Sequence, residues 1–413
     1  MNEYYDTIVI GAGHAGLATS YCLTQKRRSH LVLEKHAVGE AWRSAKWDSF
    51  TLVSPNWTLR LPGFHYQGDD PDGFLKREEV VCYLEDYVRA AGLPVRTGVH
   101  VLSVEQHENR FLVRTTSDIF EADHVVVATG TFQKPRIPAL AGQISPDIQQ
   151  LHTSQYRNPH QLPDGAVLVV GSGQSGCQIA YELSESGRAV YLCAGSAGSL
   201  PRRYRGRDVF VWAEMLGMLD QPVSKLPSPA ARFAANPQLT GRNGGHDLNL
   251  HHLAKRGVKL LGRLHGGAGS VLSIAPDLMT TLKQMDEMSA EFRQAVDDLI
   301  AESRLDTPPD DFVALDDGYG SEIITELDLH TAGITTIIWA TGYTYDYRWL
   351  PFSIFDDTGY PIQKEGATAV PGLYFVGLHW QRVAKSDLFA GVGEEAVRVV
   401  DQIVSNDIKQ IAR

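Results

Sequence analysis

Short apolar runs and helix-like stretches alternate along the chain, and the alternation is clearest at residues 6–34. An apolar run from Asp6 to Ile10 is followed by a helical pattern as far as Cys22, and a second apolar run covers His30 to Leu33. Short continuous apolar runs are typical of strands buried on both faces of a parallel sheet. The N-terminal pattern therefore predicts a β-α-β unit.

A second copy of this unit begins near residue 166. An apolar run at 166–170 leads into a helical pattern that ends near Glu185, and another apolar run covers residues 189–192. Two such units predict an α/β protein with two Rossmann-like three-layer domains. We expect the first domain at residues 1–160, a second domain inserted at 161–330, and a return to the first domain at 331–413.

Apolar runs outside the two units predict the remaining strands. Strands are expected at 99–105, 111–115, 124–127, 257–261, 270–274, 335–339 and 372–377, and helices at 73–91, 212–220 and 277–302. The strands that begin at 124 and 335 both end in Ala-Thr-Gly, at Ala128, Thr129 and Gly130 and again at Ala340, Thr341 and Gly342. Small residues at the carboxyl edge of a sheet allow close approach to a ligand. We expect both turns to serve the first domain.

Glycines at fixed spacing join the first predicted strand to its helix. Gly11, Gly13 and Gly16 form a GxGxxG motif, and Glu34 ends the next strand. In this arrangement the first glycine permits a tight turn, the second lets the backbone approach a pyrophosphate, and the third lets the helix pack on the strand. A carboxylate at the position of Glu34 accepts hydrogen bonds from a ribose. These residues predict a site for an adenine dinucleotide.

The second unit repeats the glycine motif but lacks the acid. Its loop consists of Gly171, Ser172, Gly173, Gln174, Ser175 and Gly176. The position that corresponds to Glu34 is Ala194, and arginines follow at 202, 203, 205 and 207. Arginine suits phosphate oxygens, so this site is expected to prefer NADP(H), with Arg202 and Arg203 as candidate ligands. The alternative is that the arginines form a solvated surface.

Composition excludes several classes of protein. The 413-residue chain has a net charge of −11, which argues against nucleic acid as a partner. No apolar run reaches the length that crosses a membrane, and the chain enters its first strand too early for a signal peptide. Four scattered cysteines without a CxxC motif favour the cytoplasm and argue against a dithiol oxidoreductase. His246, His251 and His252 match no standard metal-ligand spacing, so we expect no metal.

Two further stretches are candidates for contact with a ring system. Residues 38–57 contain Trp42, Trp47, Phe50 and Trp57 in a non-periodic order that suits a loop over a flat ring, although surface packing would also explain these aromatics. Residues 386–396 lead into the C-terminal helix. A helix N-terminus carries partial positive charge, which would stabilise a reduced, anionic flavin.

Together these motifs resemble the class B flavin-dependent monooxygenases. The likeness is strongest to flavin-containing monooxygenases, including plant indolepyruvate monooxygenases and bacterial relatives. Residues 38–43 are similar to the family's Gly-Gly-x-Trp-Arg loop, with Glu40 at the second glycine. The family's linker motif, F-x-G-x-x-x-H-x-x-x-(Y/F), is matched by His152 and Tyr156, whereas Pro146 and Ile148 replace its Phe and Gly.

The resemblance implies an activity and a set of contacts. FAD and NADPH would be the cofactors, and one oxygen atom of O2 would pass from a flavin C4a-hydroperoxide to a small organic substrate. The expected neighbour of the reacting oxygen is Asn56, with Ser54 and Trp57 as lesser candidates; a turn residue after Pro55 is the alternative for Asn56. A homodimer is possible. Besides the glycine loops, Glu34 and the Ala-Thr-Gly turns, the implied cofactor contacts are Lys35, Trp42, Arg43, Val101, Ser196, Leu378 and Phe389.

Two other functions stay open. The degenerate linker motif is compatible with an NADPH oxidase or flavin reductase that makes hydrogen peroxide or passes electrons to a partner. A module that senses NADP(H) and holds FAD as a structural element is the second alternative, and it would show very slow flavin reduction by NADPH.

Overall fold

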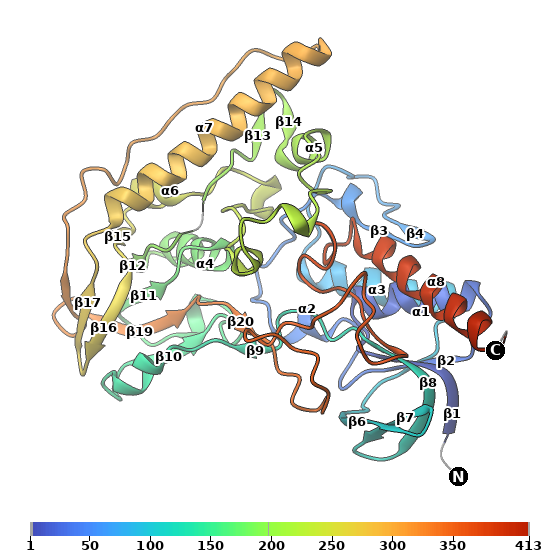
Figure 1. The fold of residues 1–413 in the computed structure, drawn as a ribbon. Coiled ribbons are helices and arrows are strands. Elements are labelled where there is room, and N and C mark those ends of the chain that lie inside the picture. The colour runs from blue at the N-terminus through green and yellow to red at the C-terminus, as the bar shows by residue number, and fades with distance from the viewer. Residues whose placement is uncertain (1–2, 197, 412–413) are drawn as a thin grey trace.

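The chain forms a mixed sheet and a parallel sheet, each covered by helices, in a computed structural model that describes residues 3–196 and 198–411 (Figure 1). The first sheet has the order β5-β2-β1-β8-β7-β6, and β21 also pairs with β8. Its strands are β1 (Glu3–Ile10), β2 (His30–Leu33), β5 (Val95–Arg96), β6 (Val101–His107), β7 (Arg110–Thr115), β8 (Ile119–Val127) and β21 (Leu373–Phe375). β7 is antiparallel to both of its neighbours, β6 and β8, whereas every other pairing in this sheet is parallel.

The second sheet repeats the parallel part of the first. Its order is β10-β19-β11-β12-β15, and every pairing is parallel. The strands are β10 (Gln149–His152), β11 (Ala166–Val170), β12 (Val190–Cys193), β15 (Lys259–Leu261) and β19 (Ile334–Trp339). β11 corresponds to β1, and β12, β15, β19 and β10 correspond to β2, β5, β8 and β21. The duplication predicted from two β-α-β units thus extends over five strands of each sheet.

The pairing of β19 and β10 corrects one expectation. We expected residues 335–339 to rejoin the first domain, but Ile337 pairs with Leu168 of the second sheet. Residues 149–152, which lie inside the expected first segment, pair with β19 in the same sheet. Both sheets offer a buried, β-branched central strand, so the apolar run at 335–339 carries no signal that selects one of them. Only β21 returns to the first sheet as expected.

Helices cover both sheets and bury a common core. Their bounds are α1 (His14–Gln25), α2 (Glu40–Ser44), α3 (Arg77–Ala91), α4 (Gln174–Glu185), α5 (Val209–Met215), α6 (Leu250–Lys255), α7 (Leu278–Ser303) and α8 (Val392–Ile411). α1 contacts both α3 and α8 in the first domain, and α4 contacts α6 in the second. One apolar cluster joins the helix-covered faces of both sheets, from Val9 to Val167. Each sheet has a separate cluster on its other face.

Two predicted helices differ in their limits. The helix expected at 73–91 begins at Arg77, because Lys76 is its N-cap and the Glu79 side chain accepts from the Lys76 backbone N–H at 2.7 Å. The helix expected at 212–220 spans 209–215 instead, and the side chain of Asp208 caps its start. The long helix expected at 277–302 is confirmed as α7, which runs along the outer edge of the second domain (Figure 1).

Short elements complete the fold. They are β3 (Arg60–Leu61), β4 (Phe64–His65), β9 (Lys134–Pro135), β13 (Arg203–Tyr204), β14 (Arg207–Asp208), β16 (Leu264–Ala268), β17 (Val271–Ile274), β18 (Glu326–Asp328) and β20 (Tyr343–Thr344). Single 3-10 turns lie at Asn56–Thr58, Ala139–Gln143, Pro159–Gln161, Val223–Lys225, Pro229–Phe233 and Arg242–Gly244. Within the described residues, no helix combines the length and the apolar character needed to cross a membrane.

The chain passes between the two domains twice, and the crossings lie side by side. β9 leaves the first domain and pairs antiparallel with β20, which leaves the second (Figure 1). We call this two-stranded connection, β9 paired with β20, the seam. β8 and β19 are followed, after short turns, by β9 and β20, so ligands at the two sheet edges would approach each other at the seam.

Candidate dinucleotide sites and active site

The first glycine loop has the shape that a pyrophosphate requires. Gly11 has φ +108°, and a Cβ there would lie 2.6 Å from the Ala128 carbonyl oxygen. A Cβ on Gly16 would lie 1.9 Å from the Gly11 oxygen, so each of these positions accepts only glycine. At Gly13 no described atom lies within 4 Å of an added Cβ, which leaves the backbone open to a ligand. These residues fit a dinucleotide.

The predicted ribose ligand is held at the end of β2. Glu34 Oε2 accepts from the backbone N–H of Ala12 at 2.8 Å, and Oε1 accepts from the N–H of His36 at 3.0 Å. The carboxylate is therefore fixed beside the glycine loop, with lone pairs left for a ribose. Lys35 next to it is exposed. Val101, by contrast, is 8% exposed and belongs to the apolar cluster beneath the first sheet.

The second glycine loop repeats this geometry. Gly171 has φ +106°, and a Cβ there would lie 2.6 Å from the Ala340 carbonyl oxygen; a Cβ on Gly176 would lie 1.9 Å from the Gly171 oxygen. Gly173 has only Ala235 Cβ nearby, at 3.8 Å from an added Cβ. Gln174 and Ser175 open α4, and Ser172 Oγ accepts from the Gly195 N–H at 2.8 Å.

This geometry also corrects the assignment of the second Ala-Thr-Gly turn. Ala128 packs against Gly11, whereas Ala340 packs against Gly171. Ala340, Thr341 and Gly342 thus adjoin the second glycine loop and not the first, because β19 pairs with β11. His152, the histidine of the linker motif, is fully buried and donates from Nε2 to the Gly342 carbonyl at 3.0 Å. Tyr156 of the same motif donates to Glu182 Oε2 on α4 at 2.8 Å.

Arg202 is committed to an internal contact. Its side chain is 1% exposed, its Nε donates to Asp208 Oδ2 at 2.8 Å, and its Nη1 donates to the Val53 carbonyl at 2.6 Å. The guanidinium also lies over the ring of Phe74, 4.5 Å from its centroid. A phosphate ligand would have to break this ion pair. Arg202 therefore ties the second domain to the loop at 53, which the run of arginines alone does not indicate.

The other arginines differ in their availability. Arg203 is exposed and donates to the carbonyls of Gly245 and Gly244, at 2.8 and 2.9 Å. Arg205 pairs with Asp297 of α7 at 3.0 Å, and Arg207 lies over the Trp212 ring. Ser196, just after β12, is exposed. Arg203 is exposed and has no acidic partner among the described residues, so it stays the candidate for the 2′-phosphate. Arg207 also lacks such a partner, but it is partly buried over the Trp212 ring.

Aromatic side chains gather beside the first glycine loop. Trp42 stacks on Phe389 with ring centroids 5.8 Å apart, and Phe389 lies 4.7 Å from the ring of His14, within the loop itself. Phe50 contacts Trp42 at 5.9 Å. The predicted contacts Trp42 and Phe389 are thus brought together. Arg43 instead pairs with Glu85 and donates to the Val38 carbonyl, and Leu378 is buried.

Asn56 is fixed by its own loop. Its side chain is 3% exposed; Nδ2 donates to the Asp70 carbonyl at 2.9 Å and Oδ1 accepts from the Leu75 N–H at 2.8 Å. The amide has one N–H left for another acceptor. These bonds agree with the structural alternative for Asn56, and its role in the reaction stays a prediction.

A partly buried histidine–aspartate pair lies before α8 and was not predicted. His379 Nδ1 donates to Asp387 Oδ2 at 2.8 Å, and His14 Nε2 donates to the Asp387 main-chain carbonyl at 2.9 Å. Asp387 Oδ1 is buried without a partner among the described residues. An unmatched acceptor next to the first glycine loop fits a cofactor hydroxyl. No local pattern indicated this arrangement, because His14 lies more than 360 residues before the other two in the chain.

Protonation of His379 should make stability depend on pH. Burial lowers the pKa of His379. The hydrogen bond and the charge of Asp387 raise this pKa by more than burial lowers it, so the net shift is upward. A group with a raised folded-state pKa stabilises the fold below its unfolded pKa, and this contribution is lost as pH rises through the folded value. His379→Gln should therefore be less stable than the wild type at acidic pH, with the gap closing at alkaline pH. Urea unfolding across this range measures it, and a constant gap would contradict the assignment.

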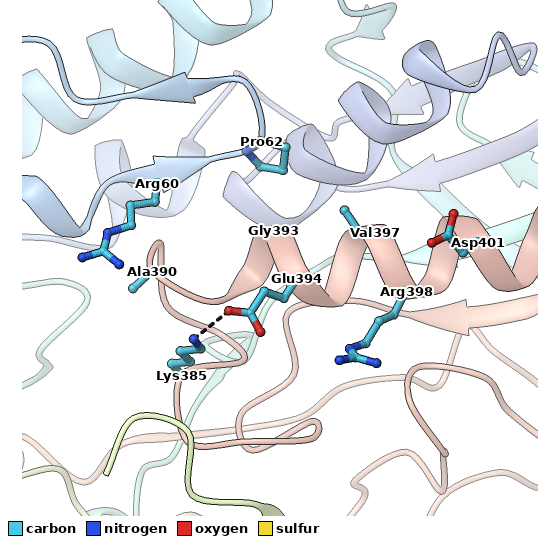
Figure 2. Close-up of a pocket in the computed structure, with 9 residues that line it drawn as sticks. All are labelled: Arg60, Pro62, Lys385, Ala390, Gly393, Glu394, Val397, Arg398 and Asp401. Atoms are coloured by element: carbon cyan, nitrogen blue, oxygen red, sulfur yellow. Dashed lines mark ion pairs between the residues drawn. The ribbon is translucent and has the colours of Figure 1, made fainter. Parts of the chain in front are cut away.

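A pocket lies elsewhere, between β3 and α8. It has a volume of about 620 Å³ and is lined by Arg60, Pro62, Lys385, Ala390, Gly393, Glu394, Val397, Arg398 and Asp401 (Figure 2). Its charges pair with neighbouring groups: Arg60 with Glu214, and Lys385 with Asp220 and Glu394. None of the predicted site residues lines it. In the described part of the chain, no group of three His, Cys, Asp or Glu side chains is placed to hold a metal ion.

The cysteines are unsuited to electron relay. All four are free, and Cys22, Cys177 and Cys193 are buried. Burial raises the pKa of Cys22 and of Cys193 to about 12, and that of Cys177 upward as well. Thiolates are the reactive form in disulfide exchange, and Cys82 on α3 has no second thiol paired with it.

Comparison with known proteins identifies the family. Residues 8–205 match the family described as pyridine nucleotide-disulphide oxidoreductase. A protein of Geobacillus kaustophilus named "Uncharacterized oxidoreductase CzcO-like" is 34% identical over 98% of this chain and 100% of its own length. Indole-3-pyruvate monooxygenase YUCCA1 of Oryza sativa is 29% identical over 49% of this chain and 51% of its own length. The chain belongs to the family of these CzcO-like oxidoreductases.

Solved structures of flavin monooxygenases share the fold. A flavin-containing monooxygenase from Stenotrophomonas maltophilia superposes with a TM-score of 0.67 at 21% identity, covering 98% of this chain and 99% of that one. The predicted fold, with two Rossmann-like domains, is thereby confirmed. A flavoprotein oxidoreductase is the general function that these relatives support.

Proposed function

We propose that this protein is an NADPH- and FAD-dependent monooxygenase that inserts one oxygen atom of O2 into a small organic substrate. The observation that carries the proposal is the pair of matched glycine loops, each backed by its own Ala-Thr-Gly turn, on two sheets that meet at the seam. Hydride transfer between two dinucleotides needs such an approach of two sheet edges. The resemblance to flavin monooxygenases supports oxygenation as the reaction that follows hydride transfer. The unpaired cysteines disfavour disulfide reduction.

The residues at the first loop have distinct proposed roles. Gly11, Gly13 and Gly16 would bind the FAD pyrophosphate, and Glu34 its ribose. When bound, FAD supplies the oxygen chemistry, through the C4a-hydroperoxide that the family resemblance implies. Trp42 and Phe389 would exclude water beside it, since their rings pack against each other. Asn56 would orient the reacting oxygen with its remaining N–H, held in place by the Asp70 and Leu75 backbone.

One observation favours the oxidase alternative. In the linker motif, Ile148 stands where the family has glycine, and it is buried in the core of the second sheet. Tyr156 is also buried and bonded to Glu182. Both residues therefore support the second domain, and what the motif contributes to oxygenation in relatives would have to come from other residues. An NADPH oxidase that releases hydrogen peroxide is the second candidate.

Rapid-scan absorbance distinguishes the two functions. The protein is reduced anaerobically with NADPH and then mixed with oxygenated buffer. A monooxygenase should show a long-lived species distinct from the oxidised and the reduced flavin. Direct return to oxidised flavin with one peroxide formed per NADPH, unchanged by added organic acids, amines and thioethers, would favour the oxidase. Failure of NADPH to reduce the flavin would overturn both proposals.

A further inference from the structure

Lys46 carries a positive charge that its surroundings do not neutralise. Its Nζ lies 5.7 Å from the ring centroid of Trp42 and 5.0 Å from those of Phe50 and Phe132. Within residues 3–196 and 198–411, the Lys46 amine forms no ion pair with a carboxylate and no hydrogen bond with any other group. We call Lys46 and the three rings the aromatic cage.

Neighbouring charges are already matched with one another. Arg43 pairs with Glu85, and Arg77 pairs with Asp48 at 3.2 Å. Asp48 also accepts from Asn158 Nδ2 at 2.7 Å. Burial among the rings lowers the pKa of Lys46 to about 8. Cation–π contacts offset only part of the cost of removing an ammonium from water, so the fold gains little by placing a lysine here.

The backbone holds Lys46 at the seam. Its carbonyl accepts from Arg77 Nη1 at 3.1 Å and from Arg157 Nη1 at 3.4 Å, and Arg157 belongs to the segment that follows β10. The adjacent residues Trp47 and Phe50 line a small cavity together with Tyr181 of α4. The backbone at Lys46 is thus held both by α3 of the first domain and by the segment after β10 of the second sheet.

The cage adjoins the first cofactor site and is open on one side. Trp42 forms one wall of the cage and also stacks on Phe389, which contacts His14 of the first glycine loop. Phe132 forms another wall, two residues after the turn that backs this loop. Its side chain is 60% exposed, so a molecule from solvent can reach the amine past this ring.

We propose that Lys46 binds the carboxylate of the substrate, and that the protein acts on organic acids with an apolar or aromatic body. The ammonium would pair with the carboxylate, while the faces of Trp42, Phe50 and Phe132 would cover the apolar part. Pairing inside a partly desolvated cage is stronger than in water. The inference rests on the proposed function for its meaning as a substrate site, but the binding itself requires no turnover.

Calorimetric titration of the FAD-bound enzyme, without NADPH, tests the site directly. The probes are phenylpyruvate, indole-3-acetate and octanoate, each compared with its neutral methyl ester. We expect the wild type to bind at least one acid about tenfold or more tightly than its ester. In Lys46→Met this preference should disappear through weaker acid binding, with the ester unchanged, and Lys46→Arg should restore part of it.

The control is Lys283→Met, on the exposed face of α7, which should behave as the wild type. If the wild type binds no acid of the panel, or prefers none to its ester, the proposal is wrong. It is also wrong if Lys46→Met keeps the preference, or if that variant loses affinity for NADPH and not for the acids, because Lys46 would then be a coenzyme ligand. Failure of the monooxygenase proposal would appear separately, in the oxygen reaction.

Discussion

Gly173→Ala should leave FAD bound and remove the response to NADPH. An added Cβ at this position meets only Ala235 Cβ at 3.8 Å, an ordinary contact, so the fold should tolerate the change. The methyl group would nevertheless stand where the backbone must approach the pyrophosphate. We expect a rise of about tenfold or more in the Kd for NADPH, measured by anaerobic reduction at increasing NADPH, with flavin content and thermal stability unchanged.

Gly13→Ala is the matched variant in the first loop. No described atom lies within 4 Å of its added Cβ, so it too should fold, but it should be purified with little FAD. It should still bind NADPH, which calorimetry can measure. The reverse pattern, with FAD lost from Gly173→Ala and retained by Gly13→Ala, would mean that the two cofactors are assigned to the wrong loops. Gly16→Ala and Gly176→Ala are unsuitable, because a Cβ at either would lie 1.9 Å from a backbone oxygen and disturb the loop itself.

Local patterns predicted most of the fold because its units are local. The two β-α-β units follow from apolar runs of four or five residues and from glycines at fixed spacing, and they form as expected. The second Ala-Thr-Gly turn was misassigned because pairing is a long-range property. Residues 335–339 are equally apolar whichever central strand they join, and only the whole sheet order places Ala340 beside Gly171.

The candidate site was predictable where one segment supplies it and not where several do. Glu34 and the glycines lie within one unit, and their spacing alone places them. The pair His379 and Asp387, by contrast, meets His14 only because β21, which precedes the pair, returns to the first sheet. The cage around Lys46 needs Phe132 from beyond β8. A lysine among aromatics was the only available signal, and such a stretch commonly describes a surface.

The arginines show how a correct pattern can mislead about a single residue. Arginines after the second unit suggested phosphate binding, but a guanidinium binds whichever acceptor the fold brings to it. Arg202 is held by Asp208 and by the Val53 carbonyl. We therefore expect Arg202→Ala to lower the free energy of unfolding by about 3–5 kcal/mol, because it leaves the Asp208 carboxylate, 9% exposed, without its partner. Denaturant unfolding of the FAD-bound protein measures this loss.

Arg203→Ala separates stability from coenzyme choice. Its guanidinium is exposed and bonds only to two backbone carbonyls, so the variant should lose little stability. If Arg203 binds the 2′-phosphate, the KM for NADPH should rise while that for NADH stays the same.

The double variant Arg202→Met, Asp208→Asn should recover part of the stability lost in Arg202→Ala, because neither charge then remains buried alone. The double variant removes the Arg202 guanidinium without leaving a buried charge unpaired. If it lost the preference for NADPH over NADH while Arg203→Ala kept that preference, the coenzyme role would belong to Arg202.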